Sequence, residues 1–208
     1  MSVDNNLPAS DGSSPLRGPR ESPLRFVVGI TGASGTVYGV RVLEALKSAG
    51  AQTHLVLTEC AVTTMRIESG YTPEQVRALA TVSHDVNDFT APIASGSFHH
   101  DGMVVAPCSI KTLSALANAY ADNLLLRAGD VTLKERRRLV LLVRETPLSS
   151  IHLELMLRLS NAGAVIMPPV PAFYQKPASI DDMVDHTVGR VLSLLGVRND
   201  LAPQWGTR

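Results

Sequence analysis

The first residues that could do chemistry form a turn of small side chains from Gly29 to Gly35. The turn follows an apolar run and precedes a stretch with helical periodicity, so its backbone N–H groups and the positive end of a helix can face an anion. A phosphate or the edge of a flavin would fit there. Glycines also serve tight packing, and the G-x-x-G-x-x-G spacing differs from the G-x-G-x-x-G of dinucleotide-binding proteins. None of the 4 tyrosines has a lysine four residues later, which disfavours a short-chain nicotinamide oxidoreductase.

Polar residues also follow two other apolar runs. Ser109 comes directly after Pro107-Cys108, where its hydroxyl could cap the next helix or meet a ligand. Arg144 and Glu145 follow the run from Leu139 to Val143. A cation beside a carboxylate at such a position can hold a phosphate and move a proton. Both loops are therefore candidate parts of a reacting centre.

Other polar and aromatic segments give weaker signals. The proline-rich segment from Met167 could hold Tyr174 in one place, although an aromatic residue in a loop more often serves packing. The charge run from Glu135 to Arg138 is expected to be a solvated helix face. His99 and His100 lack a third ligand at metal spacing and are expected at the surface, so no metal is predicted. No Asp-rich motif for magnesium diphosphates is present, which favours a substrate with one phosphate or metal-free chemistry.

Alternating strands and helices must position these loops. Short apolar runs predict strands, and segments with apolar residues at helical spacing follow them. The predicted strands are Arg25–Ile30, Thr53–Leu57, Met103–Ala106, Leu139–Val143 and Val165–Met167, and the predicted helices are Val37–Ala49, a segment through Met65, Ser109–Tyr120, Ser149–Ser160 and Ile180–Leu195. The alternation predicts a single-domain α/β three-layer sandwich with a mainly parallel sheet of Rossmann or flavodoxin type. The loops at 31–36, 58–59, 107–109, 144–147 and 168–177 should then open on one edge, where such sheets bind ligands.

Composition limits the remaining function classes. Among 208 residues, 19 basic side chains balance 19 acidic ones, so no overall field attracts nucleic acid or an anionic membrane. Cys60 and Cys108 are far apart and fit a reduced protein without disulfides or metal. Residues 1–23 are rich in Ser, Pro, Gly and Asn and are expected to be a disordered tail before one domain at 24–208. The tail does not read as a targeting signal, and no apolar run approaches the roughly twenty residues of a spanning helix. A cytoplasmic protein with no membrane contact is expected.

Six motifs, in order along the chain, resemble the UbiX family of flavin prenyltransferases. They are Thr31-Gly32-Ala33-Ser34-Gly35, Pro107-Cys108-Ser109, Leu133-Lys134-Glu135-Arg136-Arg137, Arg144-Glu145-Thr146-Pro147-Leu148, Ser150-Ile151-His152-Leu153-Glu154 and Pro171-Ala172-Phe173-Tyr174. The match runs from about Arg25 to Trp205. The resemblance implies an enzyme that joins dimethylallyl monophosphate to N5 and C6 of reduced FMN without a metal. Its product, prenylated FMN, would serve a UbiD-type decarboxylase. The resemblance also implies a homo-oligomer, often a dodecamer with active sites shared between subunits.

The resemblance assigns roles to residues position by position. FMN would be held by Gly32, Ala33, Ser34, Thr58, Ser109, Arg127 and Arg144. The prenyl phosphate would be held by Lys134, Arg144, Tyr174 and Arg190. Catalysis would involve Ser34, Glu68, Glu145 and Lys134, with Glu145 the better candidate for proton transfer. The cations would neutralise the charge that grows on a departing phosphate.

One departure from the family pattern and two alternative functions stay open. Phe89 stands where some members carry Trp near the prenyl site, which leaves the chain length of the prenyl donor undecided. Flavin-dependent cysteine decarboxylases share the fold but use a catalytic His and an Asn-containing motif where this chain has Pro107-Cys108-Ser109. A non-catalytic FMN-binding subunit of an aromatic-acid decarboxylase is the other alternative. The sequence also leaves open whether ubiquinone biosynthesis or aromatic acid decarboxylation is served.

Overall fold

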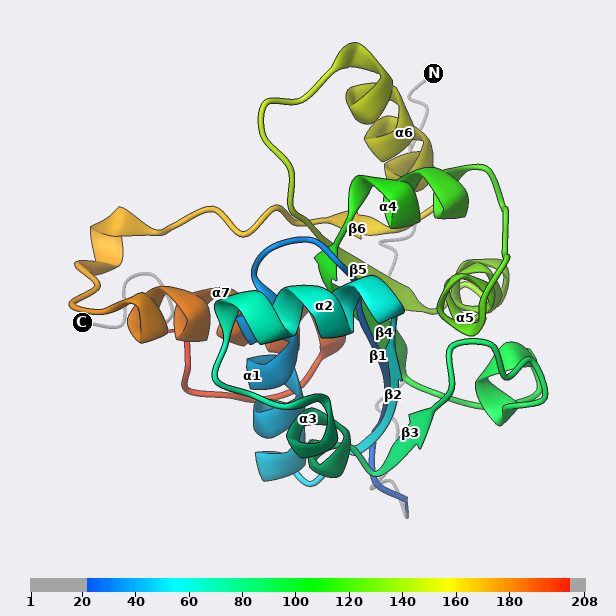
Figure 1. The fold of residues 1–208 in the computed structure, drawn as a ribbon, viewed down its shortest axis with the longest axis horizontal. Coiled ribbons are helices and arrows are strands. Elements are labelled where there is room, and N and C mark those ends of the chain that lie inside the picture. Colours follow the sequence, from blue (N-terminus) through cyan, green and yellow to red (C-terminus); the bar gives the residue numbers. More distant parts are fainter. Residues whose placement is uncertain (1–21, 203–208) are drawn as a thin grey trace, which may run out of the picture.

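A six-stranded parallel sheet forms the centre of the fold (Figure 1). The computed structural model describes residues 22–202, so the tail expected at 1–23 lies almost wholly outside the described residues. The strands are β1 (Arg25–Ile30), β2 (Gln52–Leu57), β3 (Val82–His84), β4 (Gly102–Cys108), β5 (Arg138–Val143) and β6 (Val165–Ile166). Their order across the sheet is β3-β2-β1-β4-β5-β6. The predicted α/β fold is confirmed, and of the two types left open the strand order is that of the Rossmann type.

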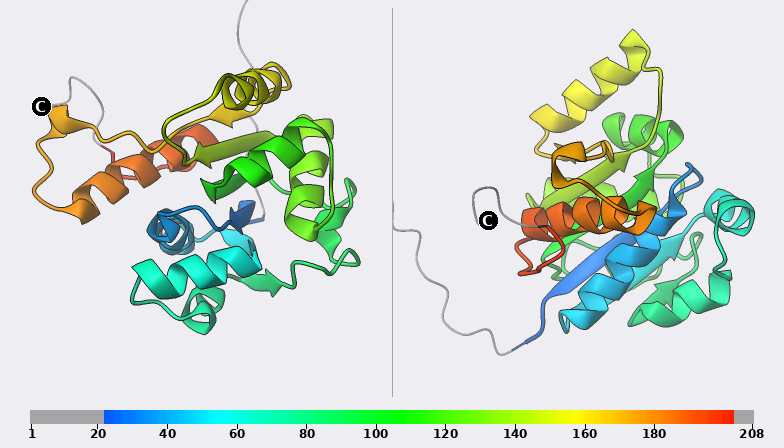
Figure 2. Two further views of the ribbon diagram at one scale, coloured as in Figure 1. Left: turned by 45° about the horizontal axis from the view of Figure 1, so that its top comes forward. Right: turned by 90° about the vertical axis from the view of Figure 1, so that its left-hand side faces the viewer.

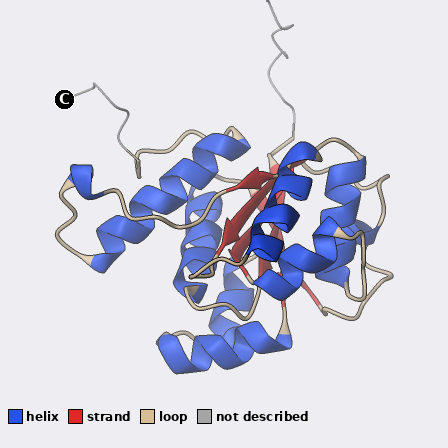
Figure 3. Ribbon diagram, turned by 90° about the horizontal axis from the view of Figure 1, so that it is seen from above, coloured by secondary structure: helices blue, strands red, loops and turns tan. Residues whose placement is uncertain are grey.

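Helices cover both faces of the sheet (Figures 2 and 3). They are α1 (Thr36–Ser48), α2 (Glu59–Glu68), α3 (Pro73–Leu79), α4 (Ile110–Ala117), α5 (Leu124–Lys134), α6 (Ser150–Asn161) and α7 (Ile180–Leu195), with the 3₁₀ turns η1 (Pro92–Ala94) and η2 (Phe173–Gln175). Within residues 22–202, no helix is both long enough and apolar enough to cross a bilayer.

Neighbouring residues of each central strand face opposite layers. Val28 and Val104 are buried in the layer of α1 and α7, whereas Val27 and Val105 are buried in the layer of α4, α5 and α6. A parallel sheet covered on both faces needs apolar residues at every position, which is why its strands read as continuous apolar runs. The same runs made β1 predictable to the residue.

The expectation that the charge run from Glu135 to Arg138 forms a solvated helix face is wrong. Helix α5 ends at Lys134, and Arg136 adopts the left-handed conformation with φ of 56°. Arg137 turns back and donates to two carbonyl groups of the segment before β4, each at 2.7 Å. The chain must stop its helix here because the buried strand β5 begins at Arg138. The run is a helix-to-strand turn at the amino edge of the sheet.

Candidate functional site

A cavity opens where the order of the strands reverses direction, at the carboxyl ends of β1 and β4. The two strands are parallel neighbours, and the chain leaves them toward opposite faces of the sheet, into α1 and α4 (Figure 1). Ligands of open α/β sheets bind at this kind of switch point. The cavity has a volume of about 450 Å³, and its lining includes Gly32, Thr58, Cys60, Ser109, Lys111 and Asn123. We call it the switch-point cavity.

Thr31 ties the two loops of the switch point together. Its hydroxyl is buried, donates to the carbonyl oxygen of Pro107 at 2.7 Å and accepts from the backbone N–H of Ser109 at 2.9 Å. The backbone N–H of Thr31 also donates to Pro107 O at 3.3 Å. These bonds fix the separation of the loops after β1 and β4. The sequence indicated Thr31 only as a member of the turn and did not predict this role.

Gly32 is required by the close approach of α2. A Cβ atom at Gly32 would lie 2.3 Å from Cβ of Cys60, a distance that real Cβ atoms essentially never show. Thr58 caps α2 by accepting from Ala61 N at 3.1 Å, and Ser109 caps α4 by accepting from Thr112 N at 3.3 Å. Of the two roles left open for Ser109, the structure therefore shows the helix cap. Ser109 still lines the cavity wall, so the N-termini of α2 and α4 border the cavity, as does that of α5 at its cap Asn123.

The turn beyond Gly32 is held by Glu68, at the end of α2. Its carboxylate accepts from Ser34 Oγ at 2.8 Å, from the backbone N–H groups of Gly35 and Thr36 at 2.7 Å each, and from Thr36 Oγ1 at 2.9 Å. Burial alone would raise the pKa of Glu68, but these hydrogen bonds outweigh it and hold the pKa below its ordinary value. The structure thus brings Ser34 and Glu68 together, as the sequence hypothesis required of two residues in one site. Gly35, with φ of 97°, supplies the backbone conformation that this turn needs.

Lys111 and Arg127 show where cations stand relative to the switch-point cavity. Lys111 lies in the first turn of α4 and lines the cavity, yet it was not among the predicted residues. Its position two residues after the Ser109 cap, in the first turn of a predicted helix at the ligand edge, was the sequence feature that could have identified it. Arg127 was predicted to hold FMN, but within its own subunit it donates to Ala94 O at 3.0 Å and pairs with Asp130 at 2.8 Å. It does not line the cavity.

Arg144 and Glu145 leave the carboxyl end of β5 and are both exposed. The Arg144 backbone donates to Cys108 O at 3.1 Å, which holds this loop beside the end of β4. Glu145 accepts from the backbone N–H of Thr146 at 3.0 Å. Burial raises the pKa of Tyr38, while the nearby charge of Arg144 lowers it in part. Tyr38 therefore lies within electrostatic reach of Arg144, a neighbour that the sequence did not reveal.

The remaining predicted phosphate ligands do not gather around Arg144 in one subunit. Lys134 ends α5 just before β5 begins, and it pairs with Glu135. Arg144 follows the other end of β5, and six residues of strand span roughly 20 Å. Tyr174 lies in η2, on a segment that extends away from the body of the fold, with its hydroxyl 3.5 Å from His186 Nε2 (Figure 1). Arg190 is exposed on α7.

His100 is not the surface residue that the sequence predicted. Its side chain is buried, and its Nδ1 lies 3.1 Å from the carbonyl oxygen of Gly102. His99 is exposed, as predicted, and its carbonyl oxygen accepts from Arg25 at 3.1 Å. The polar residues around them gave no sign that His100 lies two positions before a fully buried strand.

Comparison with known proteins places the chain among flavoproteins of closely related sequence. The sequence model described as Flavoprotein matches residues 17–192. The flavin prenyltransferase UbiX of Thauera aromatica is 52% identical over 182 residues, which cover 88% of this chain and 94% of that protein.

Two solved structures agree with the fold. The crystal structure of AnUbiX (PadA1) in complex with FMN and dimethylallyl pyrophosphate has a TM-score of 0.88 at 50% identity, and the match covers 90% of this chain and 100% of that one. The dodecameric FMN-dependent UbiX-like decarboxylase from Escherichia coli O157:H7 has a TM-score of 0.85 at 49% identity, and the match covers 88% and 99%.

Proposed function

This chain belongs to the flavoprotein family and, within it, to the UbiX-type flavin prenyltransferases, and from that premise we propose which of its residues bind, orient and react. The enzyme is a transferase that uses FMN and a dimethylallyl phosphate. When bound, reduced FMN supplies the ring atoms, N5 and C6, that accept the prenyl group. The observation that carries the assignment of the site is the Thr31 tie, which fixes two strand-end loops around the switch-point cavity.

The walls of the switch-point cavity suit an FMN phosphate and the edge of its ring. Because Gly32 has no side chain, the first turn of α2 packs directly against the glycine turn, and both contribute to the cavity wall. The N-termini of α2 and α4, capped by Thr58 and Ser109, present backbone N–H groups and the positive ends of two helix dipoles. Lys111 adds a full positive charge at the same wall, which the carboxylates of Glu59 and Asp122 also line. We therefore propose Gly32, Ala33, Ser34, Thr58 and Ser109 as FMN-binding residues and add Lys111 to them.

The cations proposed for the prenyl phosphate require more than one subunit. Lys134 and Arg144 flank opposite ends of β5, so a single subunit cannot place both on one phosphate group. We propose that a complete site combines Arg144 and Glu145 of one subunit with Lys134, Tyr174, Arg190 or Arg127 from neighbours. The guanidinium and ammonium groups would then take up the negative charge that develops as the C–O bond of the prenyl phosphate breaks.

An apolar surface on α6 supports such an assembly. Ile151 is 64% exposed and Leu157 is 62% exposed, on a helix that stands out from the sheet layers in Figure 1. Large exposed apolar side chains on one element mark an interaction surface. The UbiX-like structure at 49% identity is dodecameric, and we propose a homo-oligomer of the same kind here.

Glu145 is the residue that we propose for proton transfer. Its Oε1 accepts from Thr146 N, and no hydrogen bond to Oε2 is recorded within residues 22–202. It stands beside Arg144, so a proton held at Oε2 can pass to an oxygen of a phosphate that Arg144 binds. Ser34, oriented by Glu68, would place its hydroxyl at the other side of the reacting centre.

The product would be passed on, because prenylated FMN is itself a cofactor. We propose a UbiD-type decarboxylase as its recipient. A non-catalytic FMN-binding subunit would need neither Glu145 nor the phosphate cations, and a cysteine decarboxylase would need a different motif after β4. The names of the related proteins favour neither alternative.

The direct test is the mass of the flavin after anaerobic incubation of the purified protein with reduced FMN and dimethylallyl phosphate. The flavin should gain the mass of one prenyl unit. An unchanged flavin mass, with FMN still tightly bound, would favour the non-catalytic subunit instead.

Variants at two carboxylates sharpen this test. Glu145→Gln should slow product formation while FMN stays bound, because only the proton donor is lost. Glu74→Gln, at an exposed carboxylate on α3, is the matched control and should behave like the parent protein. Equal loss of FMN binding and of turnover in Glu145→Gln would mean that Glu145 has another role.

A further inference from the structure

Lys134 forms an ion pair with the carboxylate of the residue that follows it, Glu135. Consecutive side chains of a helix do not normally face each other. This pair forms because α5 ends at Lys134, and Glu135 is its C-cap, with φ of −85° and ψ of 7°. An exposed lysine side chain has many accessible conformations, and a carboxylate at a fixed place beside it selects a few of them.

Gly96 provides the surface against which this ion pair lies. A Cβ atom at Gly96 would lie 2.3 Å from Oε1 of Glu135 and 2.8 Å from Nζ of Lys134. Gly96 does not have a positive φ, so the backbone conformation alone does not require glycine at this position. The close approach of the ion pair is what leaves no room for a side chain.

The segment that carries Gly96 is held in place by residues on both sides of the ion pair. Arg137 donates to the carbonyl oxygens of Gly96 and Phe98, each at 2.7 Å. Arg127, on α5, donates to that of Ala94 at 3.0 Å. These bonds fix the backbone at Gly96 relative to the end of α5. The ion pair therefore lies against a surface of defined position.

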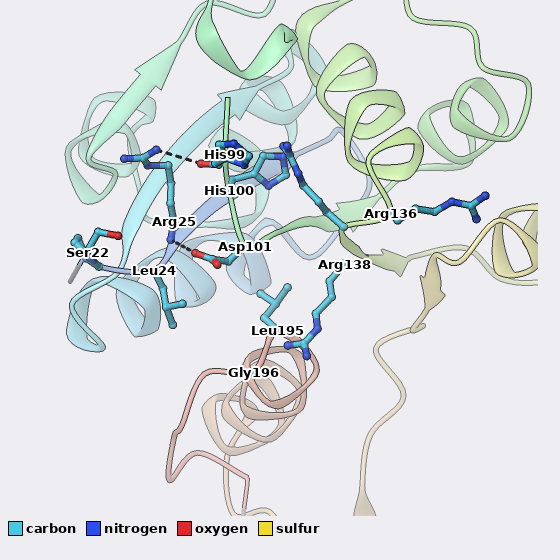
Figure 4. A pocket seen from close by; sticks show the side chains of 12 residues that line it. Ser22, Leu24, Arg25, His99, His100, Asp101, Arg136, Arg138, Leu195 and Gly196 are labelled. Atoms are coloured by element: carbon cyan, nitrogen blue, oxygen red, sulfur yellow. Dashed lines mark hydrogen bonds between the residues drawn. The ribbon is translucent and has the colours of Figure 1, made fainter. Parts of the chain in front are cut away.

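The carboxylate of Glu135 is left to Lys134 by the three arginines that follow it. Arg137 donates to the two carbonyl groups, and Figure 4 shows Arg136 extending outward and Arg138 running beside the end of α7. Within residues 22–202, no ion pair is recorded between Glu135 and any of these arginines. The hydrogen bond from Lys134 and its charge hold the pKa of Glu135 below its ordinary value, so the carboxylate is ionised at neutral pH.

We propose that Glu135 is a positioning residue for the transfer reaction, because it holds the ammonium group of Lys134 against Gly96 and so presents this cation to a neighbouring subunit in one place. The inference rests on the proposed function, in which Lys134 serves the prenyl phosphate of a neighbouring site. An ammonium group that is already ordered loses less entropy when it contacts the phosphate as the C–O bond breaks. The ion pair is exposed to solvent, so it is weak and can be exchanged for a phosphate.

The proposal predicts a change in kcat without a rise in KM. Glu135→Ala leaves the charge of Lys134 in place and removes a carboxylate that repels phosphate, so KM for dimethylallyl phosphate should not rise. The ammonium group must then be ordered in every turnover, and kcat should fall about three- to tenfold, the range for ordering one long side chain. Glu135→Gln keeps an acceptor at the same place and should retain part of the lost rate.

Gly96→Ala moves the ion pair without removing either charge. The new methyl group would displace the ends of two flexible side chains rather than backbone, so the fold should tolerate it. The kcat value should fall as it does in Glu135→Ala. Gly70→Ala is the matched control, because a Cβ atom at Gly70 would have no neighbour within 4 Å, and it should keep the parental kcat.

The experiment measures the rate of prenylated FMN formation, by flavin mass under anaerobic conditions, at varied concentrations of dimethylallyl phosphate. Glu135→Ala is compared in the parent chain and in a Lys134→Ala chain. If Glu135 acts through Lys134, its replacement should cause no further loss where Lys134 is already alanine.

Two sets of outcomes separate this inference from the proposed function. A parental kcat in both Glu135→Ala and Gly96→Ala would overturn the inference, as would an undiminished effect of Glu135→Ala in the Lys134→Ala chain. Absence of prenylated FMN with the parent protein, or a parental rate for Lys134→Ala, would overturn the proposed function and this inference with it.

Discussion

Replacing Glu68 by glutamine tests how far one carboxylate organises the glycine turn. Glutamine has the same shape, and its Oε1 can still accept from the Gly35 and Thr36 N–H groups, so the change removes charge rather than volume. Hydrogen bonds to a charged acceptor contribute about 1 kcal/mol more than neutral ones. The carboxylate accepts four of them, but Glu68 is largely exposed, and solvent screening reduces the total to about 1–2 kcal/mol.

The loss should appear as a lower melting temperature at neutral pH, measured at fixed concentrations of protein and FMN. For a chain of this size, about 1–2 kcal/mol corresponds to roughly 3–6 °C. Glu74→Gln, at an exposed carboxylate of α3 whose ion pair with Arg77 is a surface pair at 3.5 Å, is the control and should change the melting temperature much less.

The pH dependence gives this prediction its sign. The pKa of Glu68 is lowered in the folded protein, so its contribution to stability is fully present above the ordinary value of 4.5 and is lost as the pH falls through the lower, folded-state pKa. The difference between the parent protein and Glu68→Gln should therefore be constant from neutral pH down to about pH 5 and should shrink in stronger acid. A difference that is absent at neutral pH, or that grows on acidification, would refute the reasoning.

Four further predictions follow from the site. Thr31→Val should lower stability by about 1–2 kcal/mol, seen as a lower melting temperature, because it leaves the partly buried N–H of Ser109 without its acceptor. An unchanged melting temperature would contradict the tie between the loops. Gly32→Ala should reduce the FMN content of the purified protein, measured by flavin absorbance, because the new Cβ would lie 2.3 Å from Cβ of Cys60. Full FMN occupancy would show instead that α2 can move aside. Lys111→Ala should weaken FMN binding about tenfold in a fluorescence titration without changing the melting temperature of the FMN-free protein, whereas equal affinity would remove Lys111 from the site. Lys134→Ala and Glu145→Gln should each lose most of the prenyltransferase activity alone. When the two variant chains are co-expressed and form mixed oligomers, part of the activity should return. No recovery in verified mixed oligomers would mean that the two residues do not serve one site from different subunits.

The elements that the sequence predicted well carry strong local signals. Strand β1 is a continuous apolar run, and α7 has a complete capping box at Ser179 with an apolar stripe behind it. Helix α3 was missed although Thr72 and Gln75 form a capping box with Pro73 at its first position. Strand β3 could not be recognised, because two of its three residues are exposed and leave no apolar pattern.

The site was predictable in composition but not in arrangement. Ser34 and Glu68 stand in different elements, and only the resemblance placed them in one site before the structure showed their hydrogen bond. The resemblance also joined Lys134 to Arg144, ten residues apart in the chain, but the strand between them sends them to opposite edges. The resemblance predicts which side chains share a site. The direction of β5 determines whether one subunit can supply them all or whether neighbouring subunits must contribute.

The structure also changes what the glycine turn is for. The sequence suggested that this turn faces an anion, but the N–H groups of Gly35 and Thr36 already bind the carboxylate of Glu68. A helix N-terminus saturated by a side chain offers little further attraction to a phosphate. The helix N-termini that border the switch-point cavity belong to α2, α4 and α5, and Lys111 lies beside that of α4. The negative end of FMN should therefore lie toward α2 and α4, and the turn, kept rigid by Glu68, is left to position Ser34 beside the flavin ring.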